Sequence, residues 1–245
     1  MMLHPPQQRI AAAFGRQAVV YDRHAGLQRD VAQLLSERFP DMSRPRVLEI
    51  GCGTGLLTGH LLARYPDSDV LATDIAPAML QVCRGKYACQ SRLRFDLVDA
   101  EQPDIGGRFD LIASSMVAQW FSRPARTFRK LSQLLAPGGV LLYATTGPQN
   151  LPEWRRALET AGVPAACAPC NDLPGIVDER FLTIDYGSTL GFLQSVKAIG
   201  ASAPCLPERS PASSGLLRRA MRAADEACGG RMRWHIVFGK ITRRS

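Results

Sequence analysis

Short apolar runs alternate along the chain with segments in which apolar residues recur at helical intervals. The runs predict buried β-strands, which cover residues 46–51, 69–75, 93–100, 109–117 and 139–146. The segments between them predict helices, at residues 56–65, 76–88 and 126–135. Strands that alternate with helices are typical of an α/β fold, with a mostly parallel sheet covered by helices on both faces.

Further elements are expected on both sides of this alternation. Apolar residues at helical intervals over 8–39 predict two N-terminal helices, with breaks at Gly15 and Gly26. After the fifth strand we expect three more helices, at 151–162, 189–201 and 216–228. Two last strands are expected at 180–188 and 234–243, with loops over 163–180 and 203–215. The "APGG" that follows the helix at 126–135 is predicted to stop that helix.

The composition is that of an ordinary globular protein, with 46% apolar and 21% charged residues. No run of about 18 apolar residues is present, so we expect no membrane span. The N-terminal residues do not resemble a secretory signal, and the seven cysteines are an odd number. We therefore expect a cytoplasmic protein with reduced thiols, and no metal site at the isolated "CAPC" of residues 167–170.

The net charge of +8 favours an acidic partner, such as nucleic acid, anionic lipid or an acidic protein. The excess cations gather late in the chain, at Arg218, Arg219, Arg222, Arg231, Arg233, Lys240, Arg243 and Arg244. Charge alone does not choose among these partners.

A glycine-rich turn joins the first strand of the alternation to its helix. Gly51, Gly53 and Gly55 have no Cβ, so the backbone can turn tightly and approach a ligand closely. Asp74 ends the next strand about twenty residues later, where a carboxylate accepts hydrogen bonds from ribose hydroxyls. These residues predict a nucleoside-binding site at the carboxyl ends of the strands.

The spacing of the glycines departs from that of dinucleotide-binding proteins, because Leu56 stands where G-x-G-x-x-G needs its third glycine. The pattern E-x-G-x-G-x-G, which begins at Glu49, resembles the first motif of class I methyltransferases that use S-adenosyl-L-methionine (SAM). The resemblance implies a seven-stranded Rossmann-like sheet and SAM as the cofactor, which is converted to S-adenosyl-L-homocysteine. It implies that the cofactor is bound by Glu49, Gly51, Gly53, Gly55, Asp74, Ile75, Asp99, Ala100, Ser114 and Ser115.

The flanking segments resemble one family of these enzymes, the malonyl-[acyl-carrier protein] O-methyltransferases of biotin synthesis. Its N-terminal motif F-G-R-x-A-x-x-Y-x-x-H-A-x-L-Q is matched by Phe14, Gly15, Arg16, Ala18, Tyr21, His24, Ala25, Leu27 and Gln28. Matches continue at "AQWF" (118–121), "LPE" (151–153), "SVKAIGA" (195–201) and "WHIVFGKITR" (234–243), whereas residues 163–180 and those after Gly200 depart from the family. The resemblance implies one domain over residues 1–245, with an N-terminal helical lid (1–40) and cap segments (148–180 and 189–230) on the substrate side.

The resemblance also implies methyl transfer to the free carboxylate of a malonyl thioester on acyl-carrier protein. Such a carboxylate is already ionised at pH 7, so no general base is needed. We expect Tyr21 to close the methyl-transfer pocket, and Gln119 and Trp120 to shape the acceptor site. Lys197 and Arg16 are candidates to pair with the carboxylate. A basic dock for the acidic carrier protein is expected at Arg218, Arg219, Arg222, Arg231 and Arg233.

Three other functions remain open at this point. The acceptor can be another small-molecule acid, which would need no carrier dock. An RNA methyltransferase would suit the charge, but no RNA-binding module or Asn-Pro-Pro-Tyr motif is present in the sequence, so we expect no nucleic acid partner. The third alternative is a SAM-binding protein without catalytic activity.

Overall fold

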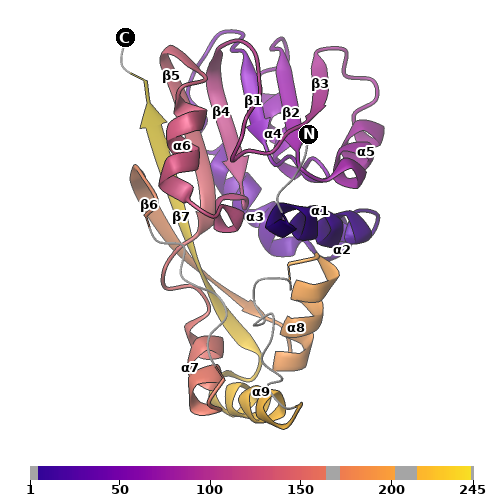
Figure 1. Cartoon of the computed structure of the whole chain (residues 1–245), viewed down its shortest axis with the longest axis vertical. Helices are drawn as coiled ribbons and strands as arrows, with labels where there is room; N and C mark the ends of the chain where they lie inside the picture. The colour runs from indigo at the N-terminus through magenta and orange to yellow at the C-terminus, as the bar shows by residue number, and fades with distance from the viewer. Residues whose placement is uncertain (1–4, 164–171, 202–213, 244–245) are drawn as a thin grey trace.

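The computed structural model describes residues 5–163, 172–201 and 214–243. Its centre is a seven-stranded sheet with the order β3-β2-β1-β4-β5-β7-β6 (Figure 1). The strands are β1 (Val47–Ile50), β2 (Val70–Asp74), β3 (Leu93–Leu97), β4 (Phe109–Ser115), β5 (Leu135–Thr146), β6 (Ile176–Asp185) and β7 (Arg231–Thr242). All neighbours are parallel except β7, which runs antiparallel to both β5 and β6. The predicted seven-stranded, mostly parallel α/β sheet is confirmed.

Helices cover both faces of the sheet because alternate strand residues point to opposite sides. Val47 packs in one hydrophobic cluster with helices α3 (Gly26–Ser36), α4 (Leu56–Arg64) and α5 (Pro77–Lys86). The next residue, Leu48, packs in the other cluster with α6 (Pro124–Ser132). Two further helices, α1 (Pro5–Gln17) and α2 (Tyr21–His24), lie beside the carboxyl ends of β1 and β2 (Figure 1).

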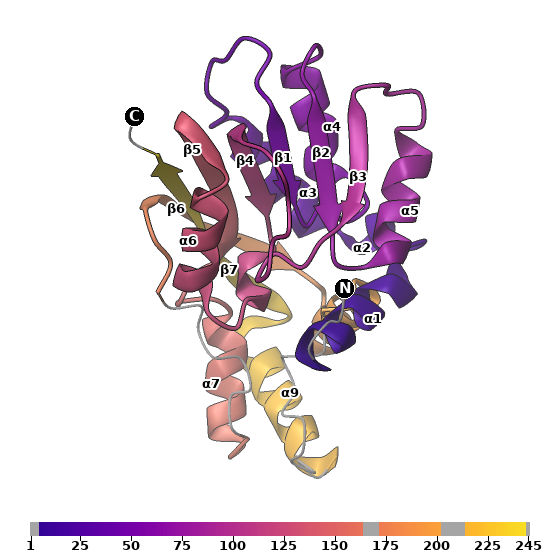
Figure 2. The same ribbon diagram turned by 45° about the horizontal axis from the view of Figure 1, so that its top comes forward.

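The β6–β7 pair extends beyond the end of β5 and carries a cap of three helices. β5 pairs with β7 as far as Ile236, whereas β6 stays paired down to Arg231. Helices α7 (Pro152–Thr160), α8 (Thr189–Ala198) and α9 (Ser214–Cys228) lie beside this extension (Figure 1). In Figure 2, α7 and α9 lie away from the upper part of the sheet. An aromatic cluster fills its centre, with Phe192 contacting the rings of Trp154, Tyr186 and Trp234. The roles of lid and cap stay predictions.

Several predicted boundaries are wrong. Gly15 lies inside α1 and does not interrupt it, and the N-terminal region forms three helices where two were expected. The "APGG" segment does not separate α6 from the fifth strand by a loop, because β5 already begins at Leu135. Gly138 there has a positive φ of 75°, and the register between β4 and β5 shifts at the same place. The glycines therefore form an irregularity within the strand.

Two other differences concern the later part of the chain. β6 begins at Ile176, inside the segment predicted to be a loop, because its residues already pair with β7 there, with an irregularity between Ile176 and Asp178. The cysteine pair of "CAPC" and the loop over 203–215 fall largely or wholly outside the described residues. Among the helices of the described ranges, none is both long and apolar enough to span a membrane.

Candidate active site

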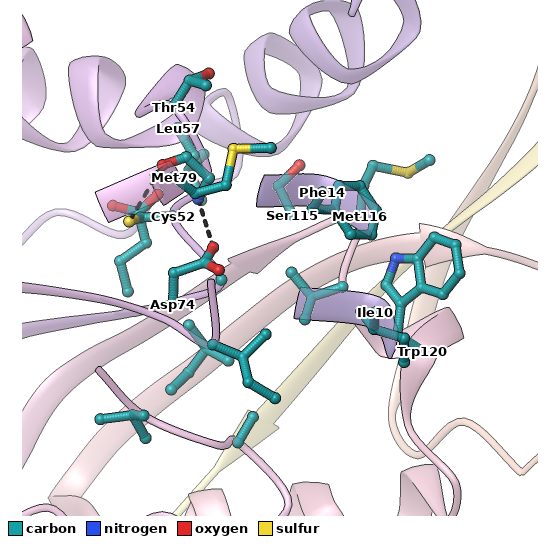
Figure 3. A pocket seen from close by; sticks show the side chains of 18 of the residues that line it. Ile10, Phe14, Cys52, Thr54, Leu57, Asp74, Met79, Ser115, Met116 and Trp120 are labelled. Atoms are coloured by element: carbon teal, nitrogen blue, oxygen red, sulfur yellow. Dashed lines mark hydrogen bonds between the residues drawn. The ribbon is translucent and has the colours of Figure 1, made fainter. Parts of the chain in front are cut away.

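A cavity with about 970 Å³ of empty space, its open mouth included, lies at the carboxyl ends of the parallel strands. Its walls come from the glycine turn after β1 and from the residues that follow β2, β3 and β4. Helices α1, α2 and α3 supply the opposite wall through Ile10, Phe14, Tyr21 and Gln28. In Figure 3, Asp74 and Cys52 lie together on one side of the cavity, whereas Ser115, Met116 and Trp120 lie on the other. The cavity is therefore at the place where open α/β sheets bind their ligands.

The glycine turn has the shape of a ligand cradle. Gly51, Gly53 and Gly55 all have left-handed backbone conformations, with φ of 68°, 54° and 91°. A Cβ on Gly51 would lie 2.4 Å from Val117, and one on Gly55 would lie 2.6 Å from the ring of Tyr87. A Cβ on Gly53 would meet nothing within 4 Å and would occupy the cavity itself. Two glycines are thus required by packing, and the middle one leaves room for a ligand.

Asp74 connects this turn to the end of β2. Its Oδ2 accepts a hydrogen bond from the Gly53 N–H at 2.8 Å, and its Oδ1 accepts one from the Ala76 N–H at 2.8 Å. Burial raises the pKa of the Asp74 carboxyl, and these backbone donors oppose the effect. The carboxylate therefore lies at the cavity wall, where ribose hydroxyls of a nucleoside would meet it.

Glu49 lies beneath the turn and has almost no contact with solvent, since only 1% of its surface is exposed. Its Oε2 accepts a hydrogen bond of 2.6 Å from the Thr58 hydroxyl of α4. Burial raises the pKa of Glu49 to about 8, and the nearby Cys83 and Asp74 add to this effect. The group is thus mostly protonated at neutral pH, which the sequence motif did not reveal.

The other predicted cofactor residues occupy different places. Ile75, Asp99 and Ala100 line the cavity, and Asp99 is held there by the Glu101 N–H at 2.9 Å. Ser115 also lines it, with a buried hydroxyl that has no hydrogen-bond partner among the described residues. The hydroxyl of Ser114 instead donates to the Ile50 carbonyl oxygen at 3.1 Å, and Ser114 is not part of the cavity wall. An unpaired buried hydroxyl in a cavity favours a bound ligand there.

Three aromatic side chains, those of Phe14, Tyr21 and Trp120, form part of the cavity wall. The ring of Phe14 meets that of Trp120 edge to face, with centroids 5.2 Å apart, and lies 6.4 Å from that of Tyr21. Burial, followed by the charges of Asp74 and Asp22, raises the pKa of Tyr21 far above its ordinary value. The phenol therefore stays protonated at physiological pH and is a hydrogen-bond donor.

Gln119 directly precedes Trp120 in the sequence, but its side chain is bound elsewhere. Its Nε2 donates to the Met116 carbonyl oxygen at 2.8 Å, and its Oε1 accepts a 2.5 Å hydrogen bond from the Thr145 hydroxyl. Gln119 does not line the cavity. Its amide instead ties the short 3-10 helix η1 (Ala118–Trp120) to β5, which positions Trp120.

The predicted basic residues all lie outside the cavity. Arg16 on α1 and Lys197 on α8 are exposed and contribute nothing to its wall. The arginines of α9 are likewise exposed, on the cap, at Arg218, Arg219 and Arg222. The structure therefore does not bring the predicted carboxylate partners to the site.

Sequence reasoning missed Gln28 and Glu101 as site residues. Gln28 matches the N-terminal family motif, and the structure adds that it lines the cavity. Glu101 lines the cavity as well, and its Oε2 accepts a 2.7 Å hydrogen bond from Gln7 of α1. Its Oε1 accepts from the Ser122 hydroxyl at 2.7 Å, so Glu101 joins α1 to the segment after β4. No local pattern signals a contact between residues 94 positions apart.

Comparison with known proteins agrees with this geometry. A family model described as a methyltransferase domain matches residues 48–141. The malonyl-[acyl-carrier protein] O-methyltransferase of Magnetococcus marinus is 36% identical over 251 residues, which cover 96% of this chain and 92% of the relative. The enzyme of the same name from Acetivibrio thermocellus is 37% identical over 77% of this chain and 76% of the relative.

Solved structures show the same fold at low sequence identity. The YcgJ protein from Bacillus subtilis has a TM-score of 0.62 and 14% identity, over 88% of this chain and 99% of that protein. A putative methyltransferase from Bacillus halodurans has a TM-score of 0.59 and 14% identity, over 87% of this chain and 99% of its own. The chain thus shares the fold of both proteins over nearly their whole length.

Proposed function

Because the chain belongs to the malonyl-[acyl-carrier protein] O-methyltransferase family, we propose that it methylates the free carboxylate of a malonyl thioester on acyl-carrier protein. In its family this is the first step toward the pimeloyl part of biotin. SAM is the methyl donor and leaves as S-adenosyl-L-homocysteine. The observation that carries the proposal is one cavity whose wall includes the glycine turn, Asp74, Tyr21 and Trp120, with Asp74 and Trp120 on opposite sides of it in Figure 3.

The described residues fit SAM as a ligand. Gly53 leaves space where its Cβ would be, the Ser115 hydroxyl is buried without a partner, and Asp74 and Asp99 offer carboxylates at the ends of neighbouring strands. Asp74 would bind the ribose hydroxyls and Asp99 the adenine amino group. SAM supplies an activated methyl group on a positively charged sulfur.

The reaction requires the protein to align the reacting groups, and it requires no proton transfer. One carboxylate oxygen forms a bond to the methyl carbon while the carbon–sulfur bond breaks, and its electron pair remains on sulfur. No proton is gained or lost, and the reference pKa near 4 means that the carboxylate is ionised beforehand. The protein's part is to orient the oxygen opposite the sulfur and to exclude water, for which α1 and α2 cover the cavity.

The carrier protein would approach the exposed basic surface of the cap. We assign its dock to the arginines of α9, all of which are exposed, at Arg218, Arg219 and Arg222. The overall charge of +8 suits an acidic partner. Surface charges of this kind chiefly raise the rate of encounter, so association should weaken as salt is added.

The test is methyl transfer from labelled SAM to a panel of acceptors. Malonyl-acyl-carrier protein and malonyl-coenzyme A should accept label, whereas free malonate and succinyl-acyl-carrier protein should accept little. If no malonyl thioester is labelled, the proposed function is wrong. Label on free malonate alone would mean that the acceptor is a free acid and that no carrier docks.

A second experiment tests the role of Tyr21. Tyr21→Phe removes the hydroxyl but keeps the ring that packs near Phe14. Loss of one hydrogen bond to a charged group should lower kcat/KM roughly 10- to 100-fold. Unchanged SAM affinity and an unchanged melting temperature would show that the fold and the donor site are intact. Full activity of the variant would remove the hydroxyl from the reaction.

A further inference from the structure

The charge of the cavity wall does not match its proposed acceptor. Among the described residues that line the cavity, none is lysine or arginine. Four carboxyl side chains do line it, namely Glu49, Asp74, Asp99 and Glu101. An acceptor carboxylate that enters the cavity would therefore find no lysine or arginine to pair with. An unpaired buried charge is strongly disfavoured.

Uncharged residues with hydrogen-bond donors also line this space. Tyr21 of α2, Gln28 of α3 and Trp120 of η1 all line the cavity. Within the described ranges none of these three side chains has a hydrogen bond, whereas the polar groups of Gln119 next to Trp120 are both bonded. Tyr21 is a neutral donor at pH 7 because the ordinary pKa of a phenol is already near 10, and burial raises that pKa further. Hydroxyl, amide and indole N–H groups can all donate to a carboxylate.

We propose that the malonyl carboxylate is held by the neutral donors Tyr21, Gln28 and Trp120, so that the sulfonium of SAM is its only positive partner. The inference rests on the proposed function and adds how the acceptor group is recognised. The site for the acceptor is then complete only when the charged methyl donor is bound.

This arrangement suits a reaction in which both charges disappear. Before transfer, the sulfonium and the carboxylate attract each other strongly in the water-poor cavity. After transfer, an ester and a thioether remain, and both are neutral at the reacting atoms. A lysine or arginine at the carboxylate would stay behind as an unpaired buried cation. It would also hold the nucleophilic oxygen in a strong ion pair before the reaction.

Two consequences follow for binding. The donor must bind before the acceptor, because the acceptor site gains its positive charge from it. S-Adenosyl-L-homocysteine, which lacks that charge, should leave a site that binds the malonyl group weakly. The affinity for the neutral ester product should not depend on the charge of the bound nucleoside.

The test is equilibrium binding of malonyl-acyl-carrier protein to the full chain with two saturating nucleosides. Sinefungin carries a protonated amine in place of the sulfonium and transfers no methyl group, whereas S-adenosyl-L-homocysteine is uncharged at that place. We expect Kd to be about tenfold lower or more with sinefungin. The carrier loaded with the malonyl methyl ester is the control, and its Kd should differ less than about twofold between the nucleosides. Equal affinity of malonyl-acyl-carrier protein in both complexes would overturn the inference.

A substitution checks which residue receives the carboxylate. Gln28→Glu keeps the size of the side chain but places a negative charge at the wall, so KM for malonyl-acyl-carrier protein should rise at least about tenfold. The matched control is Gln33→Glu, an exposed position on the same helix, where KM should not change. Sinefungin affinity should be retained in both variants, which shows that they are folded.

The outcomes separate this inference from the proposed function. If wild-type protein methylates malonyl-acyl-carrier protein but Gln28→Glu has an unchanged KM, Gln28 does not receive the carboxylate and the assignment is wrong. If wild-type protein methylates no malonyl thioester, the proposed function itself has failed.

Discussion

Glu49 should make the stability of the ligand-free protein depend on pH in an unusual direction. The substitution to examine is Glu49→Gln, which keeps the side-chain size and leaves an amide oxygen to accept the Thr58 hydrogen bond. It removes the only ionisable group at this position, which is 1% exposed. Any change in pH dependence then reports the ionisation of this carboxyl.

The magnitude comes from two pKa values. In the unfolded chain the carboxyl of Glu49 ionises with a pKa near 4.5, whereas in the folded protein it keeps its proton up to about pH 8. Between these values the native state binds more protons than the unfolded state, so the free energy of unfolding falls as pH rises. The contribution is fully present below pH 4.5 and is lost as pH passes about 8. The difference of the two pKa values corresponds to about 5 kcal/mol at most.

The assay is urea unfolding of wild type and Glu49→Gln at several pH values between 5 and 9. The free energy of unfolding of the variant should rise relative to that of the wild type as pH rises. The change should be several kcal/mol across the range and about 5 kcal/mol at most. Subtracting the two curves cancels the other titrating groups that the substitution leaves unchanged. The exposed Glu159 provides the control, because Glu159→Gln should give a curve parallel to that of wild type. A constant difference between wild type and Glu49→Gln would show that Glu49 is not protonated in the fold.

Two glycines of the turn should respond differently to alanine. Gly55→Ala places a Cβ within 2.7 Å of two side chains at a positive φ, so unfolding free energy should fall by about 2–4 kcal/mol, measured by urea unfolding. Gly53→Ala should cost only about 1 kcal/mol and mainly raise Kd for SAM, measured by calorimetry, because its Cβ would enter the cavity. A larger loss of stability in Gly53→Ala than in Gly55→Ala would contradict the roles assigned to these two glycines. Replacing the α9 arginines by glutamate should raise KM for the carrier-bound substrate, and this KM should no longer rise with added salt, because salt then screens a repulsion. KM for malonyl-coenzyme A should not change. An unchanged KM for the carrier-bound substrate would remove the dock at Arg218, Arg219 and Arg222.

The donor side of the site was predictable because its signals are local. A strand, a glycine turn, a helix and an acid at the end of the next strand follow one another within 30 residues, and parallel pairing places Asp74 beside the turn. Ser114 and Ser115 show the limit of this reasoning. They are adjacent in one strand and point to opposite sides, and only Ser115 reaches the cavity.

The acceptor side depends on how helices are rotated against distant elements, which no local pattern reports. Arg16 and Lys197 lie on helices that approach each other near Gly200, where a Cβ would come within 2.7 Å of the Ala13 carbonyl oxygen. This close contact fixes α1 against the end of α8 and leaves both cations at the surface. The protonation of Glu49 was equally hidden, because it arises from burial under a turn formed by other residues.

The distribution of charge now has a physical explanation. The chain carries a net charge of +8, yet in the described part of the protein no lysine or arginine lines the cavity, whereas Asp74, Asp99 and Glu101 do. An acid-lined wall attracts a donor that carries a sulfonium and an amine, and it repels a carboxylate that arrives first. In the proposed function, the exposed cations of the cap would attract the acidic carrier to the surface. The two signs of charge would then separate in space the binding of the donor from that of the carrier, and the bound donor would supply the positive charge that admits the malonyl group.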